Sequence, residues 1–218
     1  MVPWNSIQTV LLDMDGTLLD KHFDDYFWEE LIPEKYADRN GIPLEEAKKR
    51  LYAAYKSEEK SLNWTDILYW SGRLDLDLVS LKEGICDRVQ VHPGVAPFLN
   101  FLERRRKEIF LVTNAHPRTV QIKLGQTALI PYFGAILCSS DIGFPKEEIE
   151  FWKGAENALQ FDKTRSLFVD DNEEVLRAAQ AFGIRFLLFK THASSRRPQE
   201  ESKIFPSLKN FADLLAGP

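Results

Sequence analysis

Carboxylates, a hydroxyl, an amide and a lysine follow short apolar runs at several places in this sequence. In chain order these residues are Asp13, Asp15, Thr113, Asn114, Lys146, Asp170 and Asp171. Carboxylates that pack together without a cation repel one another, and their pKa values rise. A hard divalent ion removes that conflict, and Mg²⁺ prefers a few oxygen ligands together with water and phosphate oxygens. If the fold brings these residues together, they predict a site for a hard divalent ion such as Mg²⁺.

Taken singly, each of these residues has a simpler structural explanation. An Asp-Gly-Thr sequence, as at 15–17, is usually a turn, and an Asp-Asp-Asn sequence, as at 170–172, usually caps the N-terminus of a helix. Lys146 alone would be a solvated side chain, and Thr113 alone would be the end of a strand. The prediction of a site therefore depends on whether the fold makes all of them meet.

The elements that must position these residues are five short apolar runs. They are TVLLDM at 9–14, IFLVT at 109–113, GAILCS at 134–139, SLFVD at 166–170 and RFLLF at 185–189. Each run is almost continuously apolar, as expected of strands that are buried on both faces of a sheet. Ligands of an open parallel sheet bind beyond the carboxyl ends of its strands, near the point where the strand order reverses. The candidate residues all stand at or just past such ends.

Helical patterns separate the later runs. Apolar residues recur at helical spacing in 96–106, 119–129, 147–159 and 172–182. Strands that alternate with helices through short connections favour a parallel sheet joined by right-handed crossovers. We therefore predict an α/β fold with a doubly wound, Rossmann-like parallel sheet.

The stretch from Lys21 to about Gln90 breaks this alternation, because it contains no comparable strand. It shows four helical patterns instead, Asp25–Arg39, Leu44–Ser57, Asn63–Ser71 and Leu78–Cys86. It also holds five of the six tyrosines and three of the five tryptophans. A wholly helical block inside an α/β pattern predicts an inserted domain. We expect a core of residues 1–20 and 91–218 and a helical insertion of residues 21–90.

The composition excludes several classes of protein. With 218 residues, 44% hydrophobic and 28% charged, the chain is typical of a globular protein that buries a core. A formal net charge of −5 gives no reason to expect a nucleic acid polymer as partner. The first residues lack the pattern of a signal peptide, and no apolar run is long enough to cross a bilayer. We therefore expect a cytoplasmic protein with no membrane partner, and its oligomeric state is open.

The candidate residues match the motifs of a known family. The run Asp13-Met-Asp-Gly-Thr-Leu-Leu19 resembles the first motif of the haloacid dehalogenase superfamily, an aspartate pair followed by Gly-Thr. Thr113-Asn114 resembles its second motif, Lys146 its third, and Phe168-Val-Asp-Asp-Asn172 its fourth. The four motifs occur in order, so the resemblance covers essentially the whole chain outside the insertion.

This resemblance implies a magnesium-dependent phosphatase that hydrolyses a small phosphate monoester. Asp13 would be the nucleophile that forms an aspartyl-phosphate, and Asp15 would be the general acid and base. Mg²⁺ would bind Asp13, the backbone carbonyl of Asp15 and Asp171. Asp170 would be a further ligand or would support the ligands from behind.

The resemblance also implies which residues hold the phosphoryl oxygens. They would be the Thr113 hydroxyl, the Asn114 backbone N–H and the Lys146 ammonium. The third motif departs from the family's pattern, in which proline usually follows the lysine. Here Pro145 precedes Lys146 and Glu147 follows it.

In the resembling family, a helical insertion after the first motif is a cap of the C1 type that closes over the site and selects the substrate. The aromatic residues of this insertion have two explanations. Most recur at helical spacing, which favours a bulky core, and the alternative is a stacking surface for a flat leaving group. The segments LLDMDGTLLD and FDDYFW look like those of bacterial purine 5′-nucleotidases of this superfamily, which act on GMP and IMP. A purine nucleoside 5′-monophosphate is therefore the expected substrate.

Alternatives of other kinds stay open. A sugar-phosphate phosphatase, or a phosphotransferase that resembles β-phosphoglucomutase, would use the same aspartates. A catalytically inactive binding or regulatory module would have lost the nucleophile or a metal ligand, and neither is lost here. A haloacid dehalogenase is disfavoured, because Asp15 supplies an acid–base group that dehalogenation does not need.

Overall fold

A parallel β-sheet lies at the centre of the molecule. The computed structural model describes residues 2–215, in which the strand order is β3-β2-β1-β4-β5-β6 and neighbouring strands run parallel. The strands are β1 Thr9–Leu12, β2 Glu108–Thr113, β3 Ala135–Cys138, β4 Ser166–Asp170, β5 Phe186–Lys190 and β6 Ser207–Leu208. The order reverses at β1, which lies between β2 and β4. The carboxyl end of β1 is therefore where a ligand is expected to bind.

The five predicted strands are all present, with small differences at their ends. β1 ends at Leu12 rather than at Met14, because the chain turns there, and the Met14 carbonyl accepts from the N–H groups of Leu18 and Leu19 at 2.9 and 2.8 Å. The sequence did not predict β6, which pairs with β5. β6 consists of only two residues, Ser207 and Leu208, and is therefore too short to show an apolar run in the sequence.

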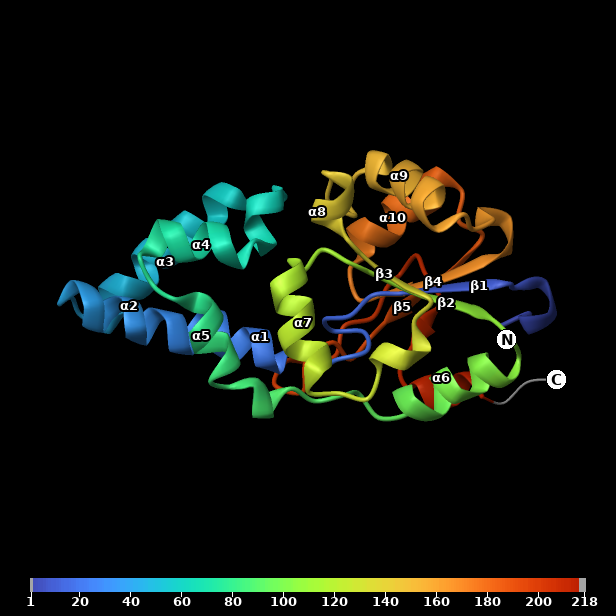
Figure 1. Cartoon of the computed structure of the whole chain (residues 1–218), viewed down its shortest axis with the longest axis horizontal. Helices are drawn as coiled ribbons and strands as arrows, with labels where there is room; N and C mark the ends of the chain where they lie inside the picture. The colour runs from blue at the N-terminus through green and yellow to red at the C-terminus, as the bar shows by residue number, and fades with distance from the viewer. Residues whose placement is uncertain (1, 216–218) are drawn as a thin grey trace.

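Helices cover both faces of the sheet. Those that follow the insertion are α6 Val95–Arg104, α7 Pro117–Gly125, α8 Ser139–Ile142, α9 Ile149–Leu159 and α10 Glu173–Phe182. Apolar residues of α6 and α7 belong to one buried cluster, and those of α9 and α10 belong to another. Figure 1 shows α9 and α10 above the sheet and α6 below it. The predicted doubly wound sheet is confirmed.

The predicted helices also differ from the observed ones mainly at their ends. α7 was expected at 119–129, but it begins at Pro117 and ends at Gly125. His116 explains the early start, because its Nδ1 accepts from the Arg118 N–H and so caps the helix, with proline at the first helical position. α8 was not predicted, since four residues are too few to show helical periodicity.

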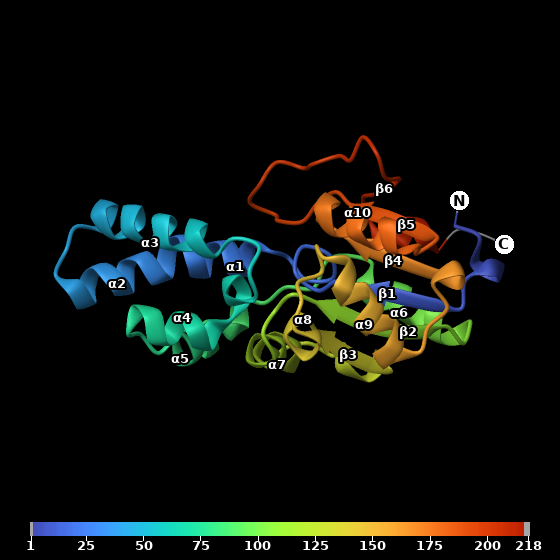
Figure 2. The ribbon, with the colours of Figure 1, turned by 90° about the horizontal axis from the view of Figure 1, so that it is seen from above.

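The insertion forms a helical body with its own core. Its helices are α1 His22–Tyr26, α2 Ile32–Asn40, α3 Leu44–Glu58, α4 Ile67–Leu74 and α5 Leu78–Glu83. A π-helical turn at Phe27–Leu31 joins α1 to α2, where a single helix was predicted. Phe27, Leu51 and Trp70 belong to a third buried cluster. Figures 1 and 2 show this body at one end of the molecule, beside α7, which confirms a parallel-sheet core with an inserted all-helical domain.

The chain enters and leaves the insertion at one place. Leu19 and Val91 pair in an isolated antiparallel bridge, and the Asp20 N–H donates to the Gln90 carbonyl at 2.9 Å. A long segment between β5 and β6 also reaches this region, as Figure 2 shows in red. Within it, the Ser194 hydroxyl donates to the Asp25 carboxylate at 2.7 Å. Both connections hold the insertion near the carboxyl end of β1.

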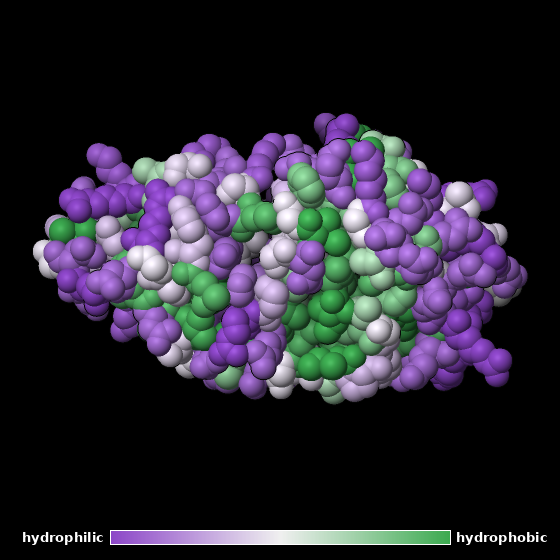
Figure 3. Space-filling model, turned by 45° about the horizontal axis from the view of Figure 1, so that its top comes forward, coloured by the Kyte–Doolittle hydropathy of each residue, from purple (hydrophilic) through white to green (hydrophobic). Residues whose placement is uncertain are grey.

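The surface is mostly hydrophilic over both ends of the face shown in Figure 3, with apolar side chains gathered near its middle. Among residues 2–215, no helix combines the length and the apolar character that crossing a membrane requires.

Candidate active site

The end of the central strand positions the first pair of aspartates. The Asp13 N–H continues the ladder with β4 by donating to the Val169 carbonyl at 3.1 Å. Gly16 then turns the chain with a φ of +87°, in the left-handed region that favours glycine. A Cβ on Gly16 would lie 2.4 Å from the Asp171 Oδ2, so only glycine fits this turn. The turn brings Asp13 and Asp15 to the same edge of the sheet.

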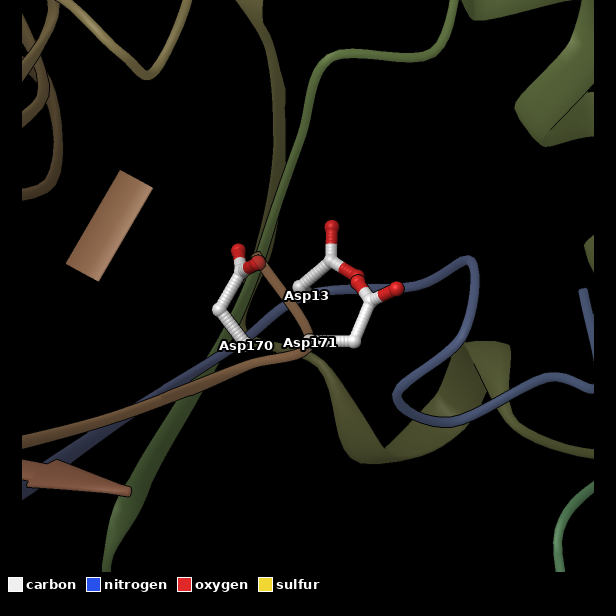
Figure 4. A group of neighbouring side chains, drawn as sticks. All are labelled: Asp13, Asp170 and Asp171. Carbon is white, nitrogen blue, oxygen red and sulfur yellow. The ribbon is translucent and has the colours of Figure 1, made fainter. Parts of the chain in front are cut away.

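Three carboxylates from β1 and β4 gather at this edge. Asp13, Asp170 and Asp171 each offer an oxygen, and these oxygens all lie within 4.8 Å of one another. Figure 4 shows the three side chains at the ends of their two chain segments. Burial raises the pKa of each of these carboxyl groups above its ordinary value. The cluster therefore favours a cation.

A buried lysine bridges two members of this cluster. The Lys146 Nζ donates to Asp13 Oδ1 at 2.6 Å and to Asp170 Oδ2 at 2.7 Å, and it lies 3.3 Å from the Val112 carbonyl. Burial alone would lower the pKa of Lys146, but Asp13 and Asp170 outweigh it and raise that pKa. Lys146 therefore stays charged, and it lies beside the carboxylates although no proline follows it in the sequence.

The donor set fits a hard divalent ion such as Mg²⁺. Asp13 Oδ2 is buried and has no hydrogen-bond partner among residues 2–215, whereas both oxygens of Asp170 already accept, one from Lys146 and one from the Asn172 N–H at 2.8 Å. The Asp171 carboxylate accepts a long hydrogen bond of 3.4 Å from the exposed Lys21. Free carboxylate oxygens on Asp13 and Asp171 are the ligands that Mg²⁺ prefers.

The two residues at the end of β2 lie beside this cluster. Thr113 is buried, and its hydroxyl accepts from the Ala115 N–H at 3.1 Å. The Asn114 side chain is fixed at both ends, because its Oδ1 accepts from the Lys146 N–H and its Nδ2 donates to Glu147, both at 2.9 Å. The loops that follow β2 and β3 are thereby tied to each other.

A second buried lysine holds Asp15. The Lys123 Nζ on α7 donates to Asp15 Oδ1 at 2.6 Å, and it also pairs with Asp24 of the insertion. Burial raises the pKa of Asp15 to about 6, although Lys123 opposes the shift. Asp15 is therefore placed as a group that can give or take a proton near neutral pH.

The insertion extends this chain of charges. Lys82 on α5 donates to Asp24 Oδ1 at 2.8 Å, and its side chain is 2% exposed. Burial would raise the pKa of Asp24, but Lys123 and Lys82 outweigh it and hold that pKa below its usual range. The sequence analysis missed Lys82, Lys123 and Asp24. The available signal was that Lys123 interrupts an otherwise buried helical face between Val120 and Leu124.

All seven predicted site residues line one cavity of about 520 Å³ between the sheet and the insertion. The insertion forms part of the cavity wall, and this part includes Trp28, Tyr52 and Trp64. Tyr52 and Trp64 are among the exposed large side chains, at 46% and 42%. We call the part of the cavity that the core carboxylates and lysines line its charged end; the insertion lines the rest with aromatic side chains and with charged ones such as Lys56 and Glu59.

Direct contacts between the insertion and the core close one side of this cavity. The Thr65 hydroxyl donates to the Asn114 carbonyl, and Lys60 pairs with Glu174 at 2.7 Å. The structure thus presents the insertion in contact with the loop after β2 and with α10.

Comparisons with known proteins agree with this site. Residues 7–183 match the model of the haloacid dehalogenase-like hydrolases. The GMP/IMP nucleotidase YrfG of Escherichia coli (strain K12) is 36% identical over 214 residues, which cover 98% of this chain and 96% of that protein. Phosphoglycolate phosphatase 1 of Pseudomonas aeruginosa is 28% identical over 126 residues, 58% of this chain and 46% of that protein.

Solved structures show the same fold. The crystal structure of a HAD phosphatase from Thermococcus onnurineus has a TM-score of 0.82 at 22% identity and covers 95% of this chain and 96% of that chain. CbbY from Rhodobacter sphaeroides, in complex with phosphate, has a TM-score of 0.68 at 14% identity and similar coverage, 95% and 96%.

The fold and the comparisons define an enzyme of the hydrolase class, and the predicted phosphatase type is confirmed. The chain belongs to the haloacid dehalogenase-like hydrolases.

Proposed function

We propose that this chain hydrolyses a small phosphate monoester, with Mg²⁺, through an aspartyl-phosphate at Asp13. The state of the Asp13 carboxylate carries the proposal. Lys146 holds Oδ1 at 2.6 Å, while Oδ2 is buried without a partner at the charged end of the cavity. A buried carboxylate oxygen without a partner costs free energy in the absence of a ligand. Its presence here supports a role toward a bound phosphoryl group.

Asp13 and Asp15 divide the reaction into two steps. In the first, an oxygen of Asp13 attacks phosphorus, the bond from phosphorus to the leaving oxygen breaks, and Asp15 donates its proton to that oxygen. In the second, Asp15 takes a proton from a water molecule, which attacks the aspartyl-phosphate, and phosphate and free Asp13 are released. The pKa of about 6 suits Asp15 for both proton transfers.

Asp13, the backbone carbonyl of Asp15 and Asp171 would hold Mg²⁺. When bound, the ion supplies positive charge that offsets the negative charge of the carboxylates and of the phosphoryl oxygens. Asp170 would lie next to the metal ligands without binding the ion directly, because both of its oxygens already accept hydrogen bonds from Lys146 and from the Asn172 N–H.

Thr113, Asn114 and Lys146 would bind the phosphoryl oxygens. Lys146 is buried and charged, so it offers a full positive charge where water cannot screen it. These donors would stabilise the charge that spreads over the oxygens in the transition state.

The proposed substrate is a purine nucleoside 5′-monophosphate such as GMP or IMP. The 36%-identical relative named for these two nucleotides supports it. Most aromatic side chains of the insertion pack in or against its buried cluster, as the bulky-core explanation expects. Tyr52 and Trp64, however, are exposed and line the cavity, where they could stack on a flat base. We infer that residues 21–90 act as a cap that selects the leaving group, in a cytoplasmic enzyme.

Phosphate release from a panel of substrates tests this proposal. The purified chain with Mg²⁺ is assayed on GMP, IMP, AMP, CMP, glucose phosphates and p-nitrophenyl phosphate, beside an Asp13→Asn variant. We expect GMP and IMP to give the highest kcat/KM. We expect the variant to lose at least about a thousandfold in kcat on every substrate, because it lacks the nucleophile.

Each other outcome has a distinct meaning. Equal activity on GMP and on sugar phosphates would reject the nucleotide substrate and keep the phosphatase. Retained activity in the Asp13→Asn variant would reject the nucleophile. Turnover of a sugar phosphate only with a sugar bisphosphate activator would identify a phosphotransferase instead.

A further inference from the structure

Glu147 occupies the place after the third-motif lysine where the resembling family usually has proline. Its side chain is half-buried, and it lines both the main cavity and a smaller polar cavity of about 150 Å³ next to it. A carboxylate at this place opposes the binding of a phosphate group, because the two charges have the same sign. Its presence therefore calls for a compensating role.

The hydrogen bonds of Glu147 indicate that role. Its Oε2 accepts from the Asn114 Nδ2 at 2.9 Å, and its Oε1 lies 3.5 Å from the Asn172 Nδ2. It thereby links the loop after β2 to the loop after β4. No proline could make either contact, since it has no polar side chain.

The Asn114 residue is held from several sides at once. Besides Glu147, the Lys146 N–H donates to its Oδ1 at 2.9 Å, and Ser139 and Thr65 donate to its carbonyl oxygen. Fixing both ends of the side chain and the carbonyl fixes the orientation of the residue. The backbone N–H of Asn114 is the group proposed to bind a phosphoryl oxygen.

We infer that Glu147 is a positioning residue that holds Asn114 in the orientation required to bind the phosphoryl group. The inference rests on the proposed function and adds a residue that the family's motifs do not include. Binding of phosphate then depends on a side chain of the same sign as the ligand. The gain from an oriented donor exceeds the loss from repulsion.

The test compares Glu147→Ala with Glu147→Gln and with Glu148→Ala. Glu148 is the matched control, because it is exposed and its side chain makes no capping hydrogen bond. With Mg²⁺ and p-nitrophenyl phosphate, we expect Glu147→Ala to raise KM and the inhibition constant of inorganic phosphate about tenfold. Glu147→Gln keeps an acceptor for the Asn114 amide and should stay within about threefold of the unmodified chain. Glu148→Ala should change neither constant.

If Glu147 had a purely structural role, Glu147→Ala would lower the fraction of active enzyme and therefore kcat, but it would leave KM and the inhibition constant of phosphate unchanged. That result would overturn the inference. A fall in KM would also overturn it, because repulsion would then be the dominant effect of Glu147. If Glu147→Ala does not fold, Glu147→Asp, which shortens the side chain by one methylene, is tested by the same two constants. If the unmodified chain hydrolyses no phosphate monoester, the proposed function fails, and calorimetric binding of inorganic phosphate still tests Glu147.

Discussion

Two buried lysines organise the charged end of the cavity, and they differ in what they connect. Lys146 lies between Asp13 and Asp170, all three of which belong to the core. Lys123 lies between Asp15 of the core and Asp24 of the insertion. The first set of charges is complete within the sheet and its loops. The second is complete only when the insertion is seated against the core.

This difference separates two tasks of the site. Asp13, the proposed nucleophile, and Lys146, the proposed phosphate-binding lysine, are held by contacts within the core alone. Asp15, the proposed acid–base group, is paired with Lys123, whose second partner, Asp24, belongs to the insertion. Removing the core lysine should therefore damage folding and chemistry together, whereas loosening the insertion's charges should affect mainly catalysis.

The largest effect is expected from Lys146→Met. It leaves Asp13 and Asp170 buried without their shared partner, which should cost about 3 to 5 kcal/mol of unfolding free energy without Mg²⁺. The kcat should fall at least about a hundredfold. Urea unfolding and the phosphate-release assay measure both quantities. Lys153→Met, on the exposed face of α9, is the control, and equal stability of the two variants would contradict the prediction.

A second prediction concerns the ion and the two adjacent aspartates. Mg²⁺ at a hundred times its Kd should raise the unfolding free energy by about 2.7 kcal/mol, because the unfolded chain has no such site. Asp171→Asn should abolish this gain. Asp170→Asn should keep part of it, since both Asp170 oxygens already accept from the protein. Denaturant unfolding with and without Mg²⁺ measures the gain, and the opposite ranking would make Asp170 the direct ligand.

A smaller effect is expected from Lys82→Met on the insertion's side. Asp24 then has only Lys123 as a close lysine partner, which draws Lys123 away from Asp15, and kcat/KM should fall about tenfold. The stabilisation by Mg²⁺ should stay unchanged, because Lys82 does not contact the core's carboxylates. Lys49→Met is the matched control, since Lys49 is exposed on α3 and does not line the cavity. A lost Mg²⁺ response would show that the two sets of charges are not separate.

The smallest effect concerns His92, which follows the bridge between Leu19 and Val91. Burial lowers its pKa from 6.5 to about 4, and Lys190 adds to the shift, while Asp20 opposes it. In the unfolded chain, His92 becomes protonated below about pH 6.5, whereas in the folded chain it becomes protonated only near pH 4. The stability contributed by neutral His92 is therefore complete above about pH 6.5 and falls as the pH drops toward 4. The two pKa values correspond to a loss of about 2 kcal/mol at about pH 5. Because the imidazole is not fully buried, solvent screening reduces the expected loss to about 1 kcal/mol.

Urea unfolding at about pH 7.5 and about pH 5, with His92→Gln beside the unmodified chain, measures this contribution. The variant should lose less stability on acidification than the unmodified chain does. Equal losses would show that His92 does not contribute.

The sequence predicted the polar residues at the strand ends better than the buried charges on the helices, for a physical reason. Strands buried on both faces must be continuously apolar, and the polar residues that end them stand out from that background. All seven site residues could be found in this way. β6 and α8 could not, because neither is long enough to carry a periodic pattern.

The buried charged residues on helices were harder to predict from the sequence. A lysine on a helix is solvated in most proteins, and the sequence alone does not show that a carboxylate from a distant segment meets it. Lys82 and Asp24 lie in different helices of the insertion, and Lys123 lies in the core. Only the three-dimensional arrangement brings the three together. Glu147 is a milder case, because its departure from the family's motif was visible but its hydrogen bonds were not.

The central place of β1 has a consequence for biosynthesis. The ribosome makes β1 first, but its two neighbours begin only at Glu108 and Ser166. At about 5 to 20 residues per second, β1 remains without its first partner for roughly 5 to 20 seconds. The insertion emerges complete in that interval and carries its own buried cluster. Its helices can therefore fold on the ribosome before β1, the strand that precedes Asp13, has either of its neighbours to pair with.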